Sequence, residues 1–337
     1  MTVTKCVTKR LPLRGHAAAA AARHLATASG HPDPQTVRDV EERVASKAAA
    51  DRKKKGDGAP SPLHFSLSGT GPAMFPWMAG FCHGLRSRGL VTADTTLVGL
   101  SGGAVCSALL AAGADFSPGG DVMACGQEQS DLCRDGRQGL GRLVGNMAEE
   151  LIGEDALPRL LHSENVFVAV AEAPGGSLVK ALGSEVSLHG RFVDKGDVVG
   201  ALRASTHLPY VSDGYATTTY RGAEVVDAGI RGQMFIPLEG FVHVNIFPPI
   251  GHVPEGEGAL GRLLVGAYAR LNNRAGAPVH AHPYMAGGFG MGIFGRDDLR
   301  MRPLARDEAL LRHRLGYEAF LGWHGGQGRE RDAQTSE

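Results

Sequence analysis

The stretch Thr96-Leu97-Val98-Gly99-Leu100-Ser101-Gly102-Gly103-Ala104-Val105 decides the expected fold. Residues 97–100 are apolar and predict a short strand, and residues 104–112 are small and apolar and predict a helix. A serine on so sharp a strand-to-helix turn takes strained backbone angles, so its neighbours must lack bulky side chains. Its hydroxyl then lies over a helix N-terminus, which favours negative charge. The spacing Gly-x-Ser-x-Gly therefore predicts that Ser101 is a nucleophile, with a plain glycine-rich turn as the alternative.

The amino-acid composition limits the classes of protein to which this chain can belong. The chain has 337 residues, of which 43% are hydrophobic, enough for one large α/β domain with an extension. Lys and Arg together number 35, as do Asp and Glu, so we expect no nucleic-acid partner. No apolar run reaches the roughly 18 residues that span a bilayer, so any membrane contact is expected to be peripheral.

The five cysteines, an odd number, show no spacing typical of a metal site, and we expect no metal. We expect Cys82 and Cys106 to be buried free thiols in a reducing compartment. A bond between Cys125 and Cys133 is the alternative for that pair.

The first 62 residues form a predicted extension. Residues 1–32 have no acidic residue, five basic residues and an alanine-rich run, which suits a transit peptide for a plastid or mitochondrion. A disordered basic tail is the alternative. Residues 35–55 predict a charged helix, and residues 56–62 predict a linker. The folded domain is expected to cover residues 63–325, followed by a disordered tail over 326–337.

A glycine-rich loop precedes the Ser101 stretch. Residues 63–67 predict a strand, and apolar residues from Met74 to Gly89 recur at helical spacing. Pro72 suits a helix start, and Pro76 is expected in the first turn or at the start itself. The loop between them reads Ser68-Gly69-Thr70-Gly71-Pro72. If the two strands are parallel neighbours, the N–H groups of this loop can donate to an oxyanion beside Ser101. A phosphate-binding loop is the alternative, but the Lys and the third Gly of such loops are missing.

Asp227 is the candidate base. It follows the apolar strand expected at residues 223–226 and stands before Ala228 and Gly229, so it can face a pocket from a strand end. Burial would raise its proton affinity. A turn or capping aspartate is the alternative. A Ser–Asp–His order is also formally open, because four histidines follow Asp227: His243, His252, His280 and His282. Only about two strands precede Ser101, however, whereas ordinary α/β-hydrolases place several there. We therefore expect these histidines to be loop or core residues.

Three blocks together resemble the patatin-like phospholipase family, nearest to the branch that includes animal neutral-lipid lipases. The blocks are Ser68-Gly69-Thr70-Gly71, Gly99-Leu100-Ser101-Gly102-Gly103, and Ala204-Ser205-Thr206-His207-Leu208-Pro209 followed by Val225-Val226-Asp227-Ala228-Gly229. They occur in family order, and the resemblance covers about residues 63–325. The chain departs from the family where Ala228 replaces a usual Gly, where the loop lacks a frequent basic residue, and at Met74, near an expected Gly.

The resemblance implies a three-layer α/β/α domain with a mainly parallel central sheet. It also implies a Ser101–Asp227 dyad without histidine, and no cofactor. The oxyanion would be held by N–H groups around Gly69, Thr70, Gly71 and Gly102. The implied activity is hydrolysis of fatty-acyl esters in a phospholipid, acylglycerol or galactolipid at a membrane or lipid-droplet surface. A non-catalytic lipid-binding or regulatory protein and a lipid acyltransferase are the alternatives.

The remaining pattern predicts scaffold. Strands are expected at residues 165–172, 185–192 and 242–247, and helices at 197–204, 258–271 and 307–321. Three residues of the first domain helix either line an acyl pocket or pack in the core: Phe75, Trp77 and Met78.

Overall fold

The computed structural model describes residues 32–55, 62–161, 163–232, 234–249, 267, 269–270, 278–283 and 303–335. Its helices are α2 (Val37–Lys55), α3 (Gly71–Ser87), α4 (Gly102–Ala112), α5 (Asp121–Arg134), α6 (Leu140–Leu151), α7 (Leu157–Leu161), α8 (Leu178–Gly183), α9 (Lys195–Ser205) and α12 (Arg306–Thr335). Its strands are β1 (Phe65–Leu67), β2 (Leu97–Leu100), β3 (Val166–Glu172), β4 (Val186–His189), β5 (Thr218–Tyr220), β6 (Ala223–Asp227) and β7 (Val242–Val244). Two short 3₁₀ turns are η1 (Pro174–Gly176) and η2 (Ala228–Arg231).

The strands form one mixed sheet with the pairing path β5-β6-β3-β2-β1-β7, and β4 also pairs with β3. Successive parts of one edge of β3 pair with β2 and β6, and its other edge pairs with β4. Strands β1, β2, β3 and β7 are parallel to one another, whereas β4, β5 and β6 run antiparallel to their neighbours. The fold is therefore mixed α/β with a seven-stranded, mainly parallel sheet. Parallel strands need helical crossovers, and α3 supplies the one between β1 and β2.

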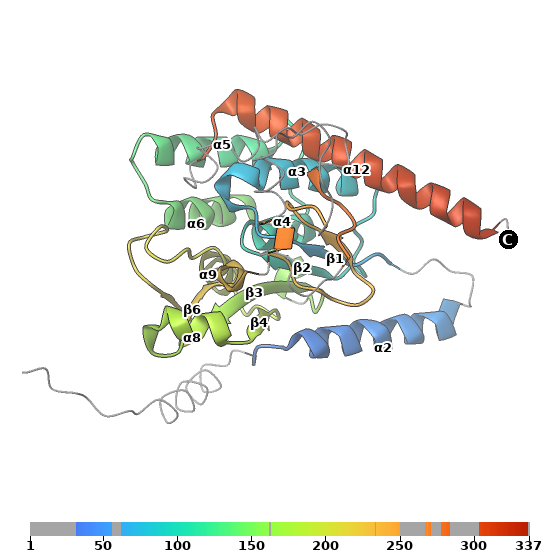
Figure 1. Ribbon diagram of the computed structural model, residues 1–337, viewed down its shortest axis with the longest axis horizontal. Coiled ribbons are helices and arrows are strands. Elements are labelled where there is room, and N and C mark those ends of the chain that lie inside the picture. The colour runs from blue at the N-terminus through green and yellow to red at the C-terminus, as the bar shows by residue number, and fades with distance from the viewer. Residues whose placement is uncertain are drawn as a thin grey trace, which may run out of the picture.

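Alternate residues of β3 belong to two separate hydrophobic clusters. Val166, Val168 and Val170 share a cluster with residues of α3, α4, α9 and α12, whereas Phe167 and Ala169 share one with residues of α2 and α8. Figure 1 shows α3 and α12 on one side of the sheet and α2 and α8 on the other. This period of two is what a strand buried on both faces requires.

Helix α12 crosses α3 at unusually close range. A Cβ atom added at Gly80 of α3 would collide with the carbonyl of His313, and one added at Gly316 of α12 would collide with the carbonyl of Trp77. Small residues let two helix backbones approach in this way. The contact secures the C-terminal helix to the helix that follows the glycine-rich loop.

Helix α3 begins at the end of the glycine-rich loop, where Pro72 suits a helix start. It starts at Gly71, with Pro72 in its first turn, where a missing N–H is tolerated. Pro76 lies inside the helix rather than in the first turn, which corrects the sequence-based expectation. The surrounding turn is buried, so packing outweighs the backbone hydrogen bond that proline removes.

Helix α2 belongs to the folded body. Val40 is fully buried in the cluster beneath the sheet, and the Arg43 guanidinium lies 4.4 Å from the centre of the Phe167 ring. Gln35 exchanges two backbone hydrogen bonds with Leu188 of β4. The charged helix was correctly expected, but these contacts place residues 32–50 within the domain. They move its boundary from residue 63 towards the N-terminus.

Two matched truncations measure this contribution. Removal of residues 1–60 should lower the free energy of unfolding by at least about 2 kcal/mol, because the burial of Val40 is lost. Removal of residues 1–30 should leave the melting curve unchanged, because it spares Pro32, whose carbonyl accepts a hydrogen bond from Arg221. Urea denaturation of both truncated proteins gives the two values. Equal stability would show that α2 contributes nothing.

The cysteines and the bounds of several strands and helices were also predicted from the sequence. Cys82, Cys106, Cys125 and Cys133 are free, so the alternative Cys125–Cys133 bond is not formed. Strands β3, β4 and β7 and helix α9 lie where they were expected, within a few residues at each end. Helix α12 continues to Thr335, through most of the tail that was expected to be disordered.

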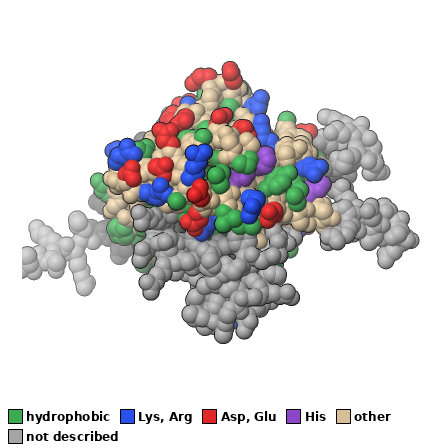
Figure 2. All heavy atoms as spheres, turned by 90° about the horizontal axis from the view of Figure 1, so that it is seen from above, with side chains coloured by type: hydrophobic (Ala, Val, Ile, Leu, Met, Phe, Trp, Pro, Cys, Tyr) green, Lys and Arg blue, Asp and Glu red, His purple; other side chains and the backbone are tan. Residues whose placement is uncertain are grey.

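The predicted transit segment at residues 1–31 and most of the helix expected at 258–271 lie outside the described residues. None of the described helices is both long and apolar enough to cross a membrane. Figure 2 shows acidic and basic side chains interspersed on one face of the described part of the molecule.

Candidate active site

Ser101 occupies a strained turn between β2 and α4. Its φ of 54° and ψ of −127° lie in a region that non-glycine residues rarely adopt. A Cβ atom at Gly99 would collide with the carbonyl of Gly103, and one at Gly103 would collide with the carbonyls of Leu67 and Ser68. Both flanking glycines are therefore required for the close approach of the turn to α4 and β1, as the sequence pattern predicts.

The sheet register brings Asp227 to Ser101. Strands β2 and β6 lie end to end along one edge of β3, because β4 occupies the other edge. Leu100, at the end of β2, pairs with Ala169, and Asp227, at the end of β6, pairs with the next residue, Val170. The carboxyl ends of the two strands therefore meet. Ser101 and Asp227, 126 positions apart in sequence, become neighbours because β2 and β6 both pair with β3.

The Asp227 side chain is buried, with 2% of its surface exposed. Burial raises the pKa of its carboxyl from an ordinary 3.8 to about 6, because the charged form loses hydration. The nearby Ser101 hydroxyl and the Gly229 N–H, which donates to the carboxylate at 2.7 Å, limit the rise in pKa by stabilising the charged form. Asp227 thus combines proximity to the serine hydroxyl with a proton affinity suited to a base near neutral pH.

Ser205 fixes the serine turn from behind. Its Oγ accepts a hydrogen bond from the Ser101 N–H at 2.8 Å and donates one to the Ala169 carbonyl at 2.7 Å. Two residues later, the His207 carbonyl accepts a hydrogen bond from the Asp227 N–H at 3.0 Å. One segment therefore holds the backbones of both candidate catalytic residues. The sequence singled out this segment only by resemblance and gave Ser205 no role.

Replacement of Ser205 by alanine tests this support. The Ser101 N–H would lose its acceptor inside the protein, so we expect a loss of about 1–3 kcal/mol in stability. Displacement of the turn should lower kcat for an ester by about ten- to a hundredfold. Ser107→Ala is the matched control, because Ser107 is also buried but its hydroxyl has no hydrogen-bond partner among the residues that the structure describes. If both variants keep wild-type kcat and melting temperature, Ser205 does not position the turn.

The N–H donors around Ser101 differ from the expected set in one respect. Gly69 donates its N–H to the carbonyl of Met234 at 2.7 Å, so this group is already used. Gly71 and Gly102 are the first residues of α3 and α4, and N–H groups of a first helical turn have no partner within the helix. A Cβ atom at Gly102 would collide with the Thr70 hydroxyl, so the glycine lets the two helix starts approach each other.

A small apolar pocket of about 70 Å³ opens beside Ser101. Helices α3, α4, α5 and α6 and the segment after α9 form its walls. Phe75 lines this pocket, whereas Trp77 and Met78 are fully buried in the core. Of the two alternatives for these side chains, Phe75 therefore lines the pocket, and Trp77 and Met78 pack in the core. The other apolar lining residues are Pro72, Val105, Leu140, Leu143, Val144, Met147 and Leu208.

The later histidines make other contacts. His243 accepts a hydrogen bond at Nε2 from the Leu238 N–H at 3.1 Å. Its Nδ1 lies 2.8 Å from the Pro278 carbonyl oxygen. His280 accepts a hydrogen bond at Nδ1 from the His243 N–H. His282 is buried beside the residue that pairs with β7. His252 lies outside the described residues.

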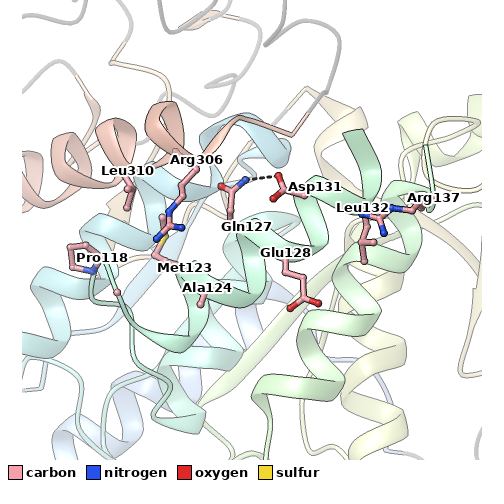
Figure 3. Close-up of a pocket in the computed structure, with 12 residues that line it drawn as sticks. Pro118, Met123, Ala124, Gln127, Glu128, Asp131, Leu132, Arg137, Arg306 and Leu310 are labelled. Atoms are coloured by element: carbon pink, nitrogen blue, oxygen red, sulfur yellow. Dashed lines mark hydrogen bonds between the residues drawn. The ribbon is translucent and has the colours of Figure 1, made fainter. Parts of the chain in front are cut away.

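A larger pocket lies apart from Ser101 (Figure 3). It measures about 480 Å³ and lies between α5 and the start of α12. Its Asp131 carboxylate already accepts hydrogen bonds from Gln127 and Arg134. Neither Ser101 nor Asp227 lines it. Size alone therefore does not locate the reactive groups, and the smaller pocket is the candidate active site.

Within the described ranges, no three His, Cys, Asp or Glu side chains cluster as metal ligands would. A scan against protein-family models finds no match, and no curated protein sequence matches the chain. The geometry of the site is therefore the basis for assigning a function.

Proposed function

We propose that this protein is a serine hydrolase of lipid acyl esters, with Ser101 as nucleophile and Asp227 as base in a three-layer patatin-like domain. One observation carries the proposal. A serine on a strained strand-to-helix turn lies beside a buried carboxylate and lines an apolar pocket. A structural serine has no need of backbone strain, and a capping aspartate has no need of a raised pKa.

The reaction follows from these two side chains. Ser101 Oγ attacks the ester carbonyl carbon while its proton passes to the Asp227 carboxylate. Asp227 then gives this proton to the departing alcohol oxygen, and an acyl-serine remains. Water then attacks the acyl carbon while Asp227 takes its proton, the bond from this carbon to Ser101 Oγ breaks to release the fatty acid, and Asp227 returns the proton to Oγ. Transfer of the acyl group to a second alcohol instead of water would use the same intermediate.

The negative charge of the tetrahedral intermediate needs donors beside Ser101. The N–H groups of Gly71 and Gly102 suit this role, because both begin helices and both residues line the pocket. Thr70 adjoins Gly102 and completes the expected set, whereas Gly69 acts through its small size beside the Ser101 Cβ.

The apolar walls favour an acyl chain over a polar substrate. A volume of about 70 Å³ is small beside the 300–1,000 Å³ of typical ligand pockets, so it fits only a short part of a fatty acid. A panel of phospholipid, acylglycerol and galactolipid substrates, with Ser101→Ala as the blank, identifies the lipid class.

A fluorophosphonate probe tests the proposal directly, because it reacts covalently only with an activated serine. We expect it to label the wild-type protein once, and mass spectrometry should locate the adduct on Ser101. The Ser101→Ala protein should take up no label. A folded wild-type protein that stays unlabelled would favour the non-catalytic lipid-binding alternative.

The pH dependence is a second test of the base. Asp227 must be deprotonated to accept the serine proton, and burial holds its pKa at about 6. We therefore expect kcat/KM to fall about tenfold per pH unit below this value and to level off above it. The measurement is a pH–rate profile on a soluble short-chain ester between the acid and alkaline unfolding limits. An inflection near 4 would instead indicate an ordinary exposed carboxylate.

A further inference from the structure

A short loop after α9 presents apolar side chains to solvent. Tyr210, Val211 and Tyr215 are 66%, 51% and 70% exposed, respectively. We call residues 209–215 the docking loop. Single exposed apolar residues are common on proteins, but three on one seven-residue loop form a local group that a partner surface can cover.

The docking loop is held in a fixed shape. The Tyr210 N–H donates to the Tyr215 carbonyl at 2.8 Å, which closes the loop. Ser212 Oγ accepts from the Leu208 N–H at 2.9 Å and donates to the Thr206 carbonyl at 3.1 Å. Tyr210 itself has a φ of 64°, a left-handed conformation that is strained for a tyrosine. The exposed side chains are therefore displayed by a structured backbone.

The docking loop also borders the candidate active site. Thr206, Leu208 and Ser212, within or just before the loop, line the pocket beside Ser101. The Ser212 carbonyl accepts the N–H of Gly141 at the start of α6, which forms another pocket wall. In Figure 1 the chain between α9 and β6 runs along the same side of the molecule as α6. A surface that covers the exposed side chains would thus lie beside the pocket.

The charge within the docking loop and the residues beside it in sequence restricts the kind of surface. Residues 204–220 contain no Lys or Arg, and Asp213 is their one acidic residue. Attraction to an anionic membrane depends on basic side chains near the surface, which this segment does not supply. Tyrosine suits the boundary between headgroups and acyl chains, because its ring is apolar and its hydroxyl is polar.

We propose that the docking loop seats the protein on a lipid surface of zwitterionic or uncharged headgroups, with Tyr210, Val211 and Tyr215 inserted at the interface. This inference rests on the proposed lipid substrate, and it identifies the part of the protein that meets the lipid aggregate. It places the pocket beside Ser101 where one acyl chain can enter without the whole lipid leaving the surface.

Sedimentation with phosphatidylcholine vesicles tests the docking loop. The full-length protein should carry Ser101→Ala, so that no lipid is consumed. Against this background we compare the triple change Tyr210→Asn, Val211→Ser and Tyr215→Ser, in which asparagine tolerates the left-handed backbone at position 210. The matched control changes two exposed leucines of α12, Leu311→Gln and Leu321→Gln.

We expect the triple change to lower the vesicle partition coefficient at least about tenfold, whereas the α12 control stays within about twofold of the parent. Phosphatidylserine in the vesicles and high salt should each change binding little. Equal binding by the triple variant, an equal loss in the α12 control, or binding that requires phosphatidylserine would each overturn the proposal.

A conservative variant guards against misfolding of the triple change. Tyr215→Trp keeps an aromatic side chain, and its added fluorescence should be quenched by brominated phosphatidylcholine. If the added indole stays unquenched in the vesicle-bound Tyr215→Trp protein, the inference is overturned. Probe labelling of the wild-type Ser101 is measured separately. Normal labelling without vesicle binding would contradict only the proposed role of the docking loop. Vesicle binding without labelling would contradict only the proposed hydrolase activity.

Discussion

Replacement of Ser101 by alanine is expected to abolish ester hydrolysis and to leave the fold intact. The hydroxyl is the one group removed, and it is the attacking atom in the proposed reaction. Loss of a catalytic serine typically lowers kcat by a factor of about 10⁴ to 10⁶. The measurement is turnover of a soluble short-chain ester, with circular dichroism and a melting curve for the fold.

Ser101→Gly separates catalysis from backbone strain. Glycine adopts a φ of 54° without penalty, whereas alanine at this position keeps the strain of the native turn. We therefore expect Ser101→Gly to be as inactive as Ser101→Ala but to melt at a higher temperature. Activity near the wild-type level in either folded variant would place the nucleophile elsewhere.

The serine turn was predictable because its physics is local. Five residues contain the strand end, the positive φ and both close approaches, at Gly99 and Gly103, that forbid side chains. The same holds for the apolar strands β2 and β3, which are recognisable from their residues alone. Asp227 was predictable only as a candidate, because its sequence context also fits a turn. Its place beside Ser101 depends on the register of β2 and β6 along β3.

Three features depended on contacts between distant segments and were not predictable. Helix α2 has a mostly charged sequence, but one of its faces packs on the sheet, where Val40 is fully buried. The Gly69 N–H is taken by Met234, which follows it by more than 160 residues in sequence. Ser205 supports Ser101 through a single side-chain oxygen. No periodicity or local motif carries information of this kind.

Replacement of Asp227 by asparagine is expected to lower kcat by at least about a hundredfold. Asparagine keeps the shape and its Oδ1 can still accept the Gly229 N–H, but it cannot accept the serine proton. Single His→Ala changes at His243, His252, His280 and His282 should each reduce kcat far less. One ester substrate and equal folding of all five variants make the comparison direct. A histidine variant as inactive as Asp227→Asn would indicate a catalytic triad. It would also contradict the proposed patatin-like domain.

The same substitution has an opposite expected effect on stability. Between an unfolded pKa of 3.8 and a folded pKa of about 6, the folded protein retains a proton that the unfolded chain releases. Stability therefore falls as the pH rises through this window, by up to about 3 kcal/mol above it. The asparagine side chain cannot ionise and avoids this loss, so the Asp227→Asn variant should be more stable than wild type at pH 8. The advantage should disappear near pH 4, where the native carboxyl is protonated.

Urea denaturation of wild type and Asp227→Asn at several pH values measures this difference. A variant that is inactive and also more stable at pH 8 would show that burial of the Asp227 charge opposes folding and serves the reaction. If the variant is instead less stable at every pH, Asp227 contributes to the fold as an ordinary turn residue. Its position beside Ser101 would then be structural, and the base would have to lie elsewhere.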